Sequence, residues 1–214
     1  MSKLVPPHGG DRLKPLLLCE RERRAALQRA ETLPRVHLSS REVSDLFMLG
    51  MGAYTPLTGF MGAADWRGVC TGMAMADGLF WPIPITLSCG QQIADGLALD
   101  SDVALVDGDG AIIATLNVQE KYTIDRALEC EQVFRTTDPA HPGVAKVMAQ
   151  GAVNLAGPVA VLSEGHYPQT YRGLYYRPVE TRAIFDQLVA VVRSHFKFEE
   201  TALAEALGVY QVDI

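Results

Sequence analysis

Hydrophobic and polar positions follow two different periods along the chain, which predicts a mixture of helices and short strands. A first helix is expected over about residues 20–32, where alanine and leucine alternate with charged side chains and Pro34 ends the helix. A second helix is expected after Ser39, because a serine suited to N-capping precedes Glu42 and Leu46 at helical spacing. The N-terminal third of the chain therefore favours helices.

The middle of the chain contains short apolar runs that are separated by turn residues. The runs at 81–87, 103–106 and 112–118 have the length of strands, and the Asp-Gly-Asp-Gly segment 107–110 joins the last two as a hairpin. Residues 49–62 contain too many glycines for a regular element and are expected to form a structured loop. Several short strands at this spacing predict a small barrel or sandwich.

The last third of the chain changes from mixed structure to helix. Helical periods are expected over 127–133 and 144–148, followed by a strand over 158–162. The pattern indicates one boundary, near residue 178, where β and loop character gives way to helix. We therefore predict an α+β domain over residues 1–177 and a helical tail over 178–214.

The tail carries a wide apolar stripe. Pro178 suits the first turn of a helix, and no Gly or Pro interrupts the pattern before Gly208. One long helix, or two helices with a kink near His195, is expected. Because such a stripe must be buried, we expect it to cover a surface left free by another domain or to pair in a homodimer.

Composition and charge narrow the class of protein. Apolar residues make up 48% and charged residues 21% of the 214 positions, as in ordinary globular proteins. The net charge is −6, from 19 basic and 25 acidic residues, which disfavours binding to an extended nucleic acid. No apolar stretch is long enough to span a membrane, and prolines and glycines occupy the N-terminus where a signal peptide needs apolar residues. We expect a cytoplasmic protein without a membrane partner.

The sequence shows no residue spacing that is typical of a metal or cofactor site. The four cysteines are far apart and have no histidine at a spacing that suits zinc, so free, reduced thiols are expected. Asp107 and Asp109 lack the further oxygen ligands of a calcium loop and are better explained by the hairpin turn. We predict neither a metal site nor a bound cofactor.

One polar loop, RTTDPAHPG at residues 135–143, is the strongest candidate for contact with an anion or with another domain. Its guanidinium, hydroxyls and imidazole are suited to binding an anion. Alternatively, the hydroxyl and carboxylate groups bond to their own backbone and cap the helix that follows. The candidate residues are Arg135, Thr136, Thr137, Asp138 and His141.

Four aromatic residues admit two readings. Phe60, Trp66, Phe80 and Trp81 would form a stacking platform if the chain bound RNA. Core packing is the simpler explanation, because isoleucine and proline residues follow Trp81 directly.

Six segments in order along the chain resemble the N-terminal domain of the bacterial and archaeal type of ATP sulfurylase, the sulfate adenylyltransferases. The segments are KLVPPHGGDRLKPL (3–16), LGMGAYTPLTGFM (49–61), DGLFWPIPITL (77–87), VFRTTDPAHPGV (133–144), VNLAGPVAVL (153–162) and LYYRPVETRAIF (174–185). The resemblance implies a PUA-like β-barrel with helical additions, and the sequence diverges from the family after about residue 185.

The same resemblance implies that the family's chemistry belongs to a following nucleotidyltransferase domain. That domain is marked by Gln-x-Arg-Asn-Pro, a His-x-x-His pair and Gly-Arg-Asp-His, none of which occurs here. A phosphate-binding loop of the G-x-x-x-x-G-K-[ST] type is missing as well. We therefore expect the chain to have no catalytic residues and no activity alone.

Three roles remain open at this point. The first is a structural or partner-docking PUA-like domain of a sulfate adenylyltransferase. The second is a subunit of an active enzyme whose catalytic domain is encoded separately and associates in trans. The third is a small RNA-binding module of the PUA type, which the net charge of −6 disfavours.

Overall fold

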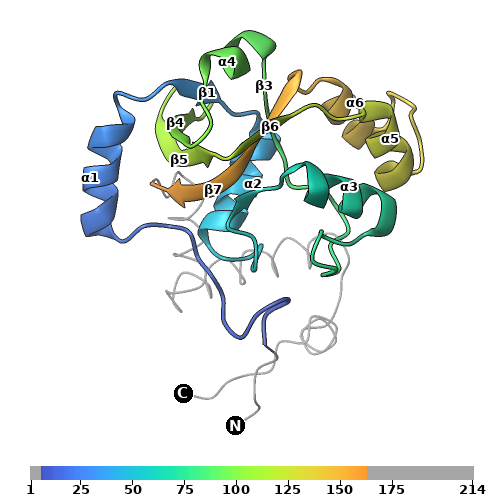
Figure 1. Ribbon diagram of the computed structural model, residues 1–214, viewed down its shortest axis with the longest axis horizontal. Coiled ribbons are helices and arrows are strands. Elements are labelled where there is room, and N and C mark those ends of the chain that lie inside the picture. Colours follow the sequence, from blue (N-terminus) through green and yellow to red (C-terminus); the bar gives the residue numbers. More distant parts are fainter. Residues whose placement is uncertain (1–5, 163–214) are drawn as a thin grey trace, which may run out of the picture. The chain divides into compact units, whose positions relative to one another are not determined.

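The computed structural model describes residues 6–162, all of which belong to one compact unit, Met1–Gly165 (Figure 1). The boundary expected near residue 178 and the tail helix lie outside the described residues. Within residues 6–162, no helix has both the length and the apolar character needed to cross a membrane. The described unit is an α+β domain, as predicted.

A mixed seven-stranded sheet, curled into a half-barrel, forms the centre of the domain. The strand order is β1-β4-β5-β7-β2, and β3 and β6 also pair with β7. Among the paired strands of the described residues, β1 and β4 run parallel and the other pairs are antiparallel. The strands are β1 (Arg35–His37), β2 (Gly59–Phe60), β3 (Leu87–Cys89), β4 (Ser101–Val106), β5 (Ile112–Val118), β6 (Glu120–Tyr122) and β7 (Val153–Val161).

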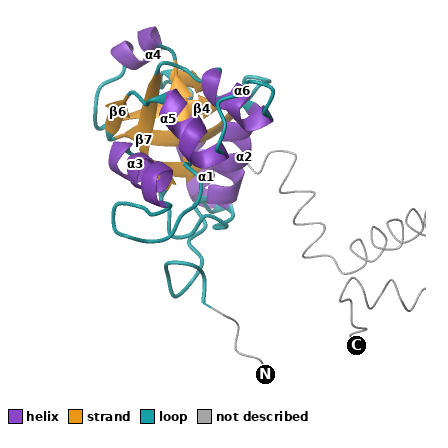
Figure 2. Cartoon of the chain, turned by 90° about the vertical axis from the view of Figure 1, so that its right-hand side faces the viewer, coloured by secondary structure: helices purple, strands orange, loops and turns teal. Residues whose placement is uncertain are grey.

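Helices surround this sheet. Figure 1 shows α1 on one side of the sheet and α5 and α6 on the other, and Figure 2 shows α3, α5 and α6 together in front of the strands. The helices are α1 (Glu20–Ala30), α2 (Ser40–Gly50), α3 (Ala63–Gly72), α4 (Gln91–Gly96), α5 (Arg126–Glu129), a π-helical turn (Cys130–Phe134) and α6 (Pro142–Met148). They seal the apolar faces of the strands from water.

Strand β7 organises the sheet, because it pairs with four other strands. Its first half pairs with β3 and β6 and its second half with β2 and β5. Gly59 and Gly157 meet where β2 crosses β7, and a Cβ atom on either glycine would collide with backbone carbonyl groups. Gly157 also has a φ angle of +146°, which side chains rarely adopt. Both positions therefore require glycine.

The sequence predicted the central hairpin and the first two helices correctly. Strands β4 and β5 are antiparallel, and Asp107 accepts hydrogen bonds from the backbone N–H groups of Asp109 and Ala111 in the turn. Helix α2 begins at a complete capping box, in which Ser39 and Glu42 each bond to the other's backbone N–H.

Two of the strand predictions were wrong in extent. The run expected over 81–87 pairs only from Leu87 onwards, because Pro82 and Pro84 have no N–H group for a ladder. The strand expected over 158–162 begins at Val153 and is nine residues long. Its early half was missed because Gly157 and Pro158 suggested a break.

Three of the four aromatic residues that the sequence singled out pack in the core. Phe60, Trp66 and Trp81 are buried, as core packing predicts. Phe80 is 58% exposed, so the expectation of core packing was wrong for this residue. Its ring contacts His8 from the N-terminal arm at a centroid distance of 6.4 Å. An exposed aromatic side chain is thus part of the domain surface.

Candidate functional site

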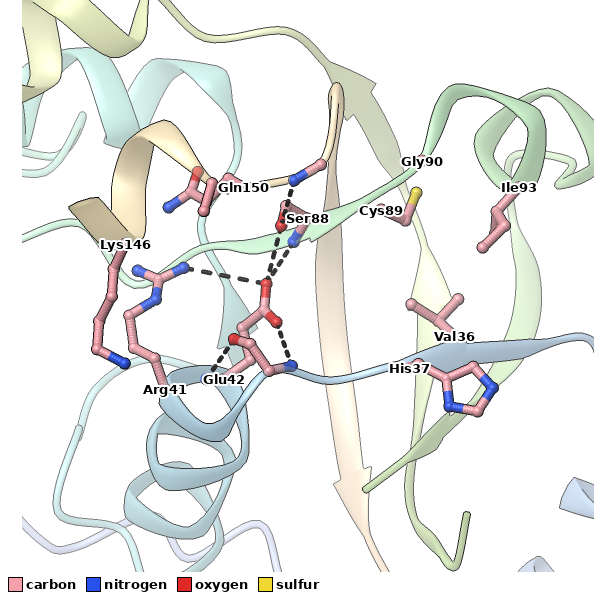
Figure 3. A pocket seen from close by; sticks show the side chains of 13 residues that line it. Val36, His37, Arg41, Glu42, Ser88, Cys89, Gly90, Ile93, Lys146 and Gln150 are labelled. Carbon is pink, nitrogen blue, oxygen red and sulfur yellow. Dashed lines mark hydrogen bonds and ion pairs between the residues drawn. The ribbon is translucent and has the colours of Figure 1, made fainter. Parts of the chain in front are cut away.

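A groove lies between β1 and β3, two strands that do not pair with each other. We call it the β1–β3 groove; its volume is about 350 Å³. The start of α2 forms its floor, and the C-terminal end of α6 with the residues after it forms one wall (Figure 3). The groove thus lies where the half-barrel is open.

Glu42 bridges this opening from the first turn of α2. One carboxylate oxygen accepts a hydrogen bond from the Ser39 N–H at 2.7 Å. The other accepts from the N–H and the hydroxyl of Ser88 at 2.8 and 3.1 Å. Glu42 is only 2% exposed, so these donors replace the water that its carboxylate would otherwise bind. A single side chain therefore connects the end of β1 to β3.

Arg41 completes the bridge beside Glu42. Its Nη2 atom donates to the backbone carbonyl of Thr86 at 3.1 Å. The C=O of Thr86 and the N–H of Ser88 lie two residues apart on the same edge of the strand segment, where a neighbouring strand would normally bond. The Arg41–Glu42 pair thus satisfies an edge that no strand of residues 6–162 covers. The Ser88 hydroxyl also accepts from the Gly151 N–H, which ties the wall to β3.

The wall on the α6 side carries polar groups that make no hydrogen bond or ion pair within residues 6–162. Lys146 is exposed and makes no ion pair or hydrogen bond with any residue in the described range. Both amide atoms of Gln150 are shielded from water, and within residues 6–162 neither has a hydrogen-bond partner. An unpaired buried amide costs about 1–3 kcal/mol. Figure 3 places the Gln150 amide and the Lys146 side chain on the same side of the groove as the Arg41 guanidinium.

The opposite end of the groove is mainly apolar, and the His37 imidazole lies beside Val36 there (Figure 3). Val36 of β1, Cys89 of β3 and Ile93 of α4 line it. Burial raises the pKa of the Cys89 thiol, with the nearby Glu42 carboxylate acting in the same direction. Cys89 is therefore protonated at neutral pH and contributes apolar surface rather than a nucleophile. The groove has a cationic end and an apolar end.

The loop that the sequence singled out lies on the surface and bonds mainly to itself. The Thr136 hydroxyl accepts from the Asp138 N–H, and the Asp138 carboxylate accepts from the Ala140 N–H. His141 is the N-cap of α6, where its Nδ1 atom accepts from the N–H groups of Gly143 and Val144.

The remaining members of that loop also stay outside the groove. Arg135 adopts the left-handed backbone region with φ at 59°, and its guanidinium donates to the Gln132 side chain at 3.5 Å, while Thr137 is exposed. The lining of the β1–β3 groove contains none of the five candidates, so the sequence did not reveal this groove.

Another buried carboxylate lies at the end of α5. Glu129 is 2% exposed and accepts a hydrogen bond from the Trp66 indole N–H at 2.6 Å. Burial raises the pKa of Glu129, and the bond from Trp66 opposes this only in part. The adjoining thiol of Cys70 has its pKa raised to about 12 by burial and by Glu129. This cluster joins α3 to the end of α5.

An apolar surface loop is the other unusual feature of the domain. We call residues 73–83 the apolar loop; Trp81 donates its backbone N–H to the Met73 carbonyl, which folds the loop onto itself. Three of its large side chains are exposed: Met73 by 43%, Phe80 by 58% and Ile83 by 45%. Neighbouring exposed apolar side chains of this size mark surfaces that contact other proteins.

Metal-binding side chains do not come together in the described part of the chain. Within residues 6–162, no group of three His, Cys, Asp or Glu residues lies close enough to hold an ion. All four cysteines are free thiols; Cys19 is exposed, and Cys70, Cys89 and Cys130 are buried.

Comparison with known proteins relates this fold to one family. A family described as PUA-like domain matches residues 5–164. The sulfate adenylyltransferase of Syntrophobacter fumaroxidans is 57% identical over 190 residues, which cover 87% of this chain and 46% of that protein. The sulfate adenylyltransferase of Chlorobaculum tepidum is 54% identical over 186 residues, with shares of 86% and 46%.

A solved structure gives the same relationship at lower identity. The structure described as a hexameric APS kinase from Thiobacillus denitrificans matches with a TM-score of 0.60 and 29% identity, covering 86% of this chain and 32% of that chain. The chain spans about half the length of the curated relatives that it matches. Together with the curled mixed sheet and the six matching segments, these comparisons show that the chain belongs to the PUA-like domain family, in the form found as the N-terminal domain of sulfate adenylyltransferases.

Proposed function

We propose that this chain acts as the PUA-like domain of a sulfate adenylyltransferase, that it docks onto a catalytic partner, and that it has no activity alone. The observation that carries the proposal is the match to sulfate adenylyltransferases at 57% identity, over a segment that makes up only 46% of the relative. The partner is the half of such an enzyme that this chain does not match.

The chemistry of the reaction supports a non-catalytic role for this half. Joining sulfate to the α-phosphorus of ATP brings two anions together, so the site needs several cations or N–H donors in fixed positions. Two Arg or Lys residues line the β1–β3 groove: Arg41, which already bonds to Thr86, and Lys146, which is exposed. This set is too small for a triphosphate and a sulfate together.

The apolar loop is the surface that we assign to docking. Phe80 and Ile83 are more exposed than the core aromatics beside them, and burying such side chains stabilises an interface by roughly 1.5–3 kcal/mol each. The loop 135–143 is a second candidate contact, in which Arg135 has the exposed guanidinium suited to a carboxylate on a partner.

An exchange assay tests the catalytic part of this proposal. The purified chain is expected to show no sulfate-dependent exchange of pyrophosphate into ATP. Adding the separately purified second half of the Syntrophobacter fumaroxidans relative is expected to give exchange, or to raise the exchange that this half shows alone. Sustained turnover by the chain by itself, in a preparation from a host that lacks its own enzyme, would refute the non-catalytic role.

A binding assay tests the docking surface. Phe80→Ser is expected to weaken binding to the same second half by about tenfold, as measured by calorimetry, because an exposed aromatic side chain becomes an anchor when it is buried. The matched control is Leu99→Ser, since Leu99 is 54% exposed but lies outside the apolar loop. Equal effects of the two substitutions would show that docking uses another surface. Arg135→Ala tests the second contact in the same way.

A further inference from the structure

The β1–β3 groove has a chemistry that its structural role does not explain. Glu42 and one nitrogen of Arg41 hold the strands together. The Nε and Nη1 atoms of Arg41, the Lys146 ammonium and the Gln150 amide have no partner within the described residues. Groups that only closed the barrel would not need these extra donors on one wall.

We propose that the β1–β3 groove binds an anionic small molecule, whose phosphate-type oxyanion lies against Arg41, Lys146 and Gln150 and whose compact apolar body lies against Val36, Cys89 and Ile93. The volume of about 350 Å³ is at the lower end of the range of about 300–1,000 Å³ that is typical of ligand pockets. It therefore accommodates a single charged group together with a ring-sized body.

The cations that line the groove favour an anion, and Arg41 also interacts with the buried carboxyls of Asp45 and Glu129 behind the lining. Glu42 is the acidic residue of the lining, and its carboxylate is engaged by Ser39 and Ser88, with the Arg41 guanidinium 4.0 Å away. Arg41 and Lys146 supply the opposite sign from α2 and α6. A guanidinium that has two free donor positions and an ammonium beside it is a common arrangement around phosphate groups.

The unpaired amide of Gln150 is a second, independent observation in favour of anion binding in the groove. Its amide is sealed from water in the free protein, so it reaches the groove only when its side chain turns. A bound oxyanion supplies the acceptor that the amide N–H groups lack, and the turn removes the unpaired amide from the interior. The side chain is therefore expected to move when the ligand binds.

The test uses the purified chain and three probes: phenyl phosphate, inorganic phosphate and phenol. Backbone amide NMR signals of Ser39, Arg41, Gly90 and Gly151 are expected to shift and saturate with phenyl phosphate, more weakly with inorganic phosphate and not with phenol. If phenol bound as tightly as phenyl phosphate, the proposed contact of an oxyanion with Arg41, Lys146 and Gln150 would be refuted. If phenyl phosphate and inorganic phosphate bound with equal affinity, the proposed contact of an apolar body with Val36, Cys89 and Ile93 would be refuted.

Matched variants separate the groove from general charge. Lys146→Gln is expected to weaken phenyl phosphate about threefold to fivefold, a modest loss because the ammonium is exposed. Lys14→Gln makes the same change in net charge outside the groove and is expected to leave the affinity unchanged. Gln150→Leu is expected to weaken binding without destabilising the free chain. The proposal fails if no probe saturates, if both lysine variants lose affinity equally, or if Gln150→Leu binds as well as the original chain.

Discussion

Replacing Glu42 with alanine removes the carboxylate that joins the end of β1 to β3 across the open side of the half-barrel. The substitution leaves the backbone N–H groups of Ser39 and Ser88 without their acceptors, and the Ser88 hydroxyl loses one of its bonds. No other strand covers this edge of β3 in the described structure, so no neighbouring carbonyl is available as a substitute.

The expected loss in the free energy of unfolding follows from the number of hydrogen-bond donors that the substitution leaves unpaired. A buried donor without a partner costs about 1–3 kcal/mol, and these two N–H groups are only partly buried, which allows some hydration. We therefore expect Glu42→Ala to lower the free energy of unfolding by about 2–4 kcal/mol, a large fraction of the roughly 5–15 kcal/mol of a typical domain. Glu42→Gln should cost less, because its carbonyl oxygen still accepts on one side while its NH₂ group faces a donor on the other.

Urea unfolding followed by circular dichroism measures both variants. The midpoint should fall while the slope with urea stays unchanged, because the surface exposed on unfolding is the same. Glu31→Ala is the matched control, since Glu31 is an exposed glutamate at the end of α1, and it should change stability by less than about 0.5 kcal/mol. A loss below about 1 kcal/mol for Glu42→Ala would refute the argument that this carboxylate replaces a strand.

Three further predictions concern the rest of the domain. Burial raises the pKa of Glu129, so the fold favours the protonated carboxyl. The protonated carboxyl stabilises the fold below the ordinary glutamate pKa, and this stabilisation is lost as the pH rises through the higher folded-state pKa. The stability of Glu129→Gln relative to the original chain should therefore increase between about pH 5 and pH 8 in urea unfolding, and a difference that is constant with pH would contradict this. Gly157→Ala should destabilise the fold by about 2–3 kcal/mol in the same assay, because the new Cβ atom meets the Asn117 carbonyl, whereas Gly108→Ala, with open space around it, should change little. A thiol reagent such as DTNB should label Cys19 alone in the native chain and all four cysteines after unfolding, since the other three are buried; rapid native labelling of Cys70 would show that α3 opens readily.

Local rules predicted those elements whose signals are themselves local. The β4–β5 hairpin follows from an Asp-Gly turn between two apolar runs, and Asp107 supplies the turn's hydrogen bonds from its own side chain. Helix α2 follows from Ser39 in the same way. In each case the residues that decide the structure lie within four positions of one another, so the sequence shows the cause directly.

Strand β7 shows why the same rules failed elsewhere. Gly157 and Pro158 normally indicate a break, yet the strand continues through both. The reason lies in residues distant along the chain: the Asn117 carbonyl of β5 leaves no room for a side chain at Gly157, and four partner strands hold β7 extended. Long-range pairing overrides the local preference, and a single sequence does not display that pairing.

The two candidate sites differ for the same physical reason. The loop 135–141 is rich in polar groups, but a chain segment without regular structure must satisfy its own backbone, and Thr136, Asp138 and His141 are largely engaged in doing so. In the β1–β3 groove, the unpaired donors of Arg41, Lys146 and Gln150 come from segments more than a hundred residues apart. Polar density along a sequence therefore measures local backbone demand, whereas a binding site depends on which donors remain free after folding has brought distant segments together.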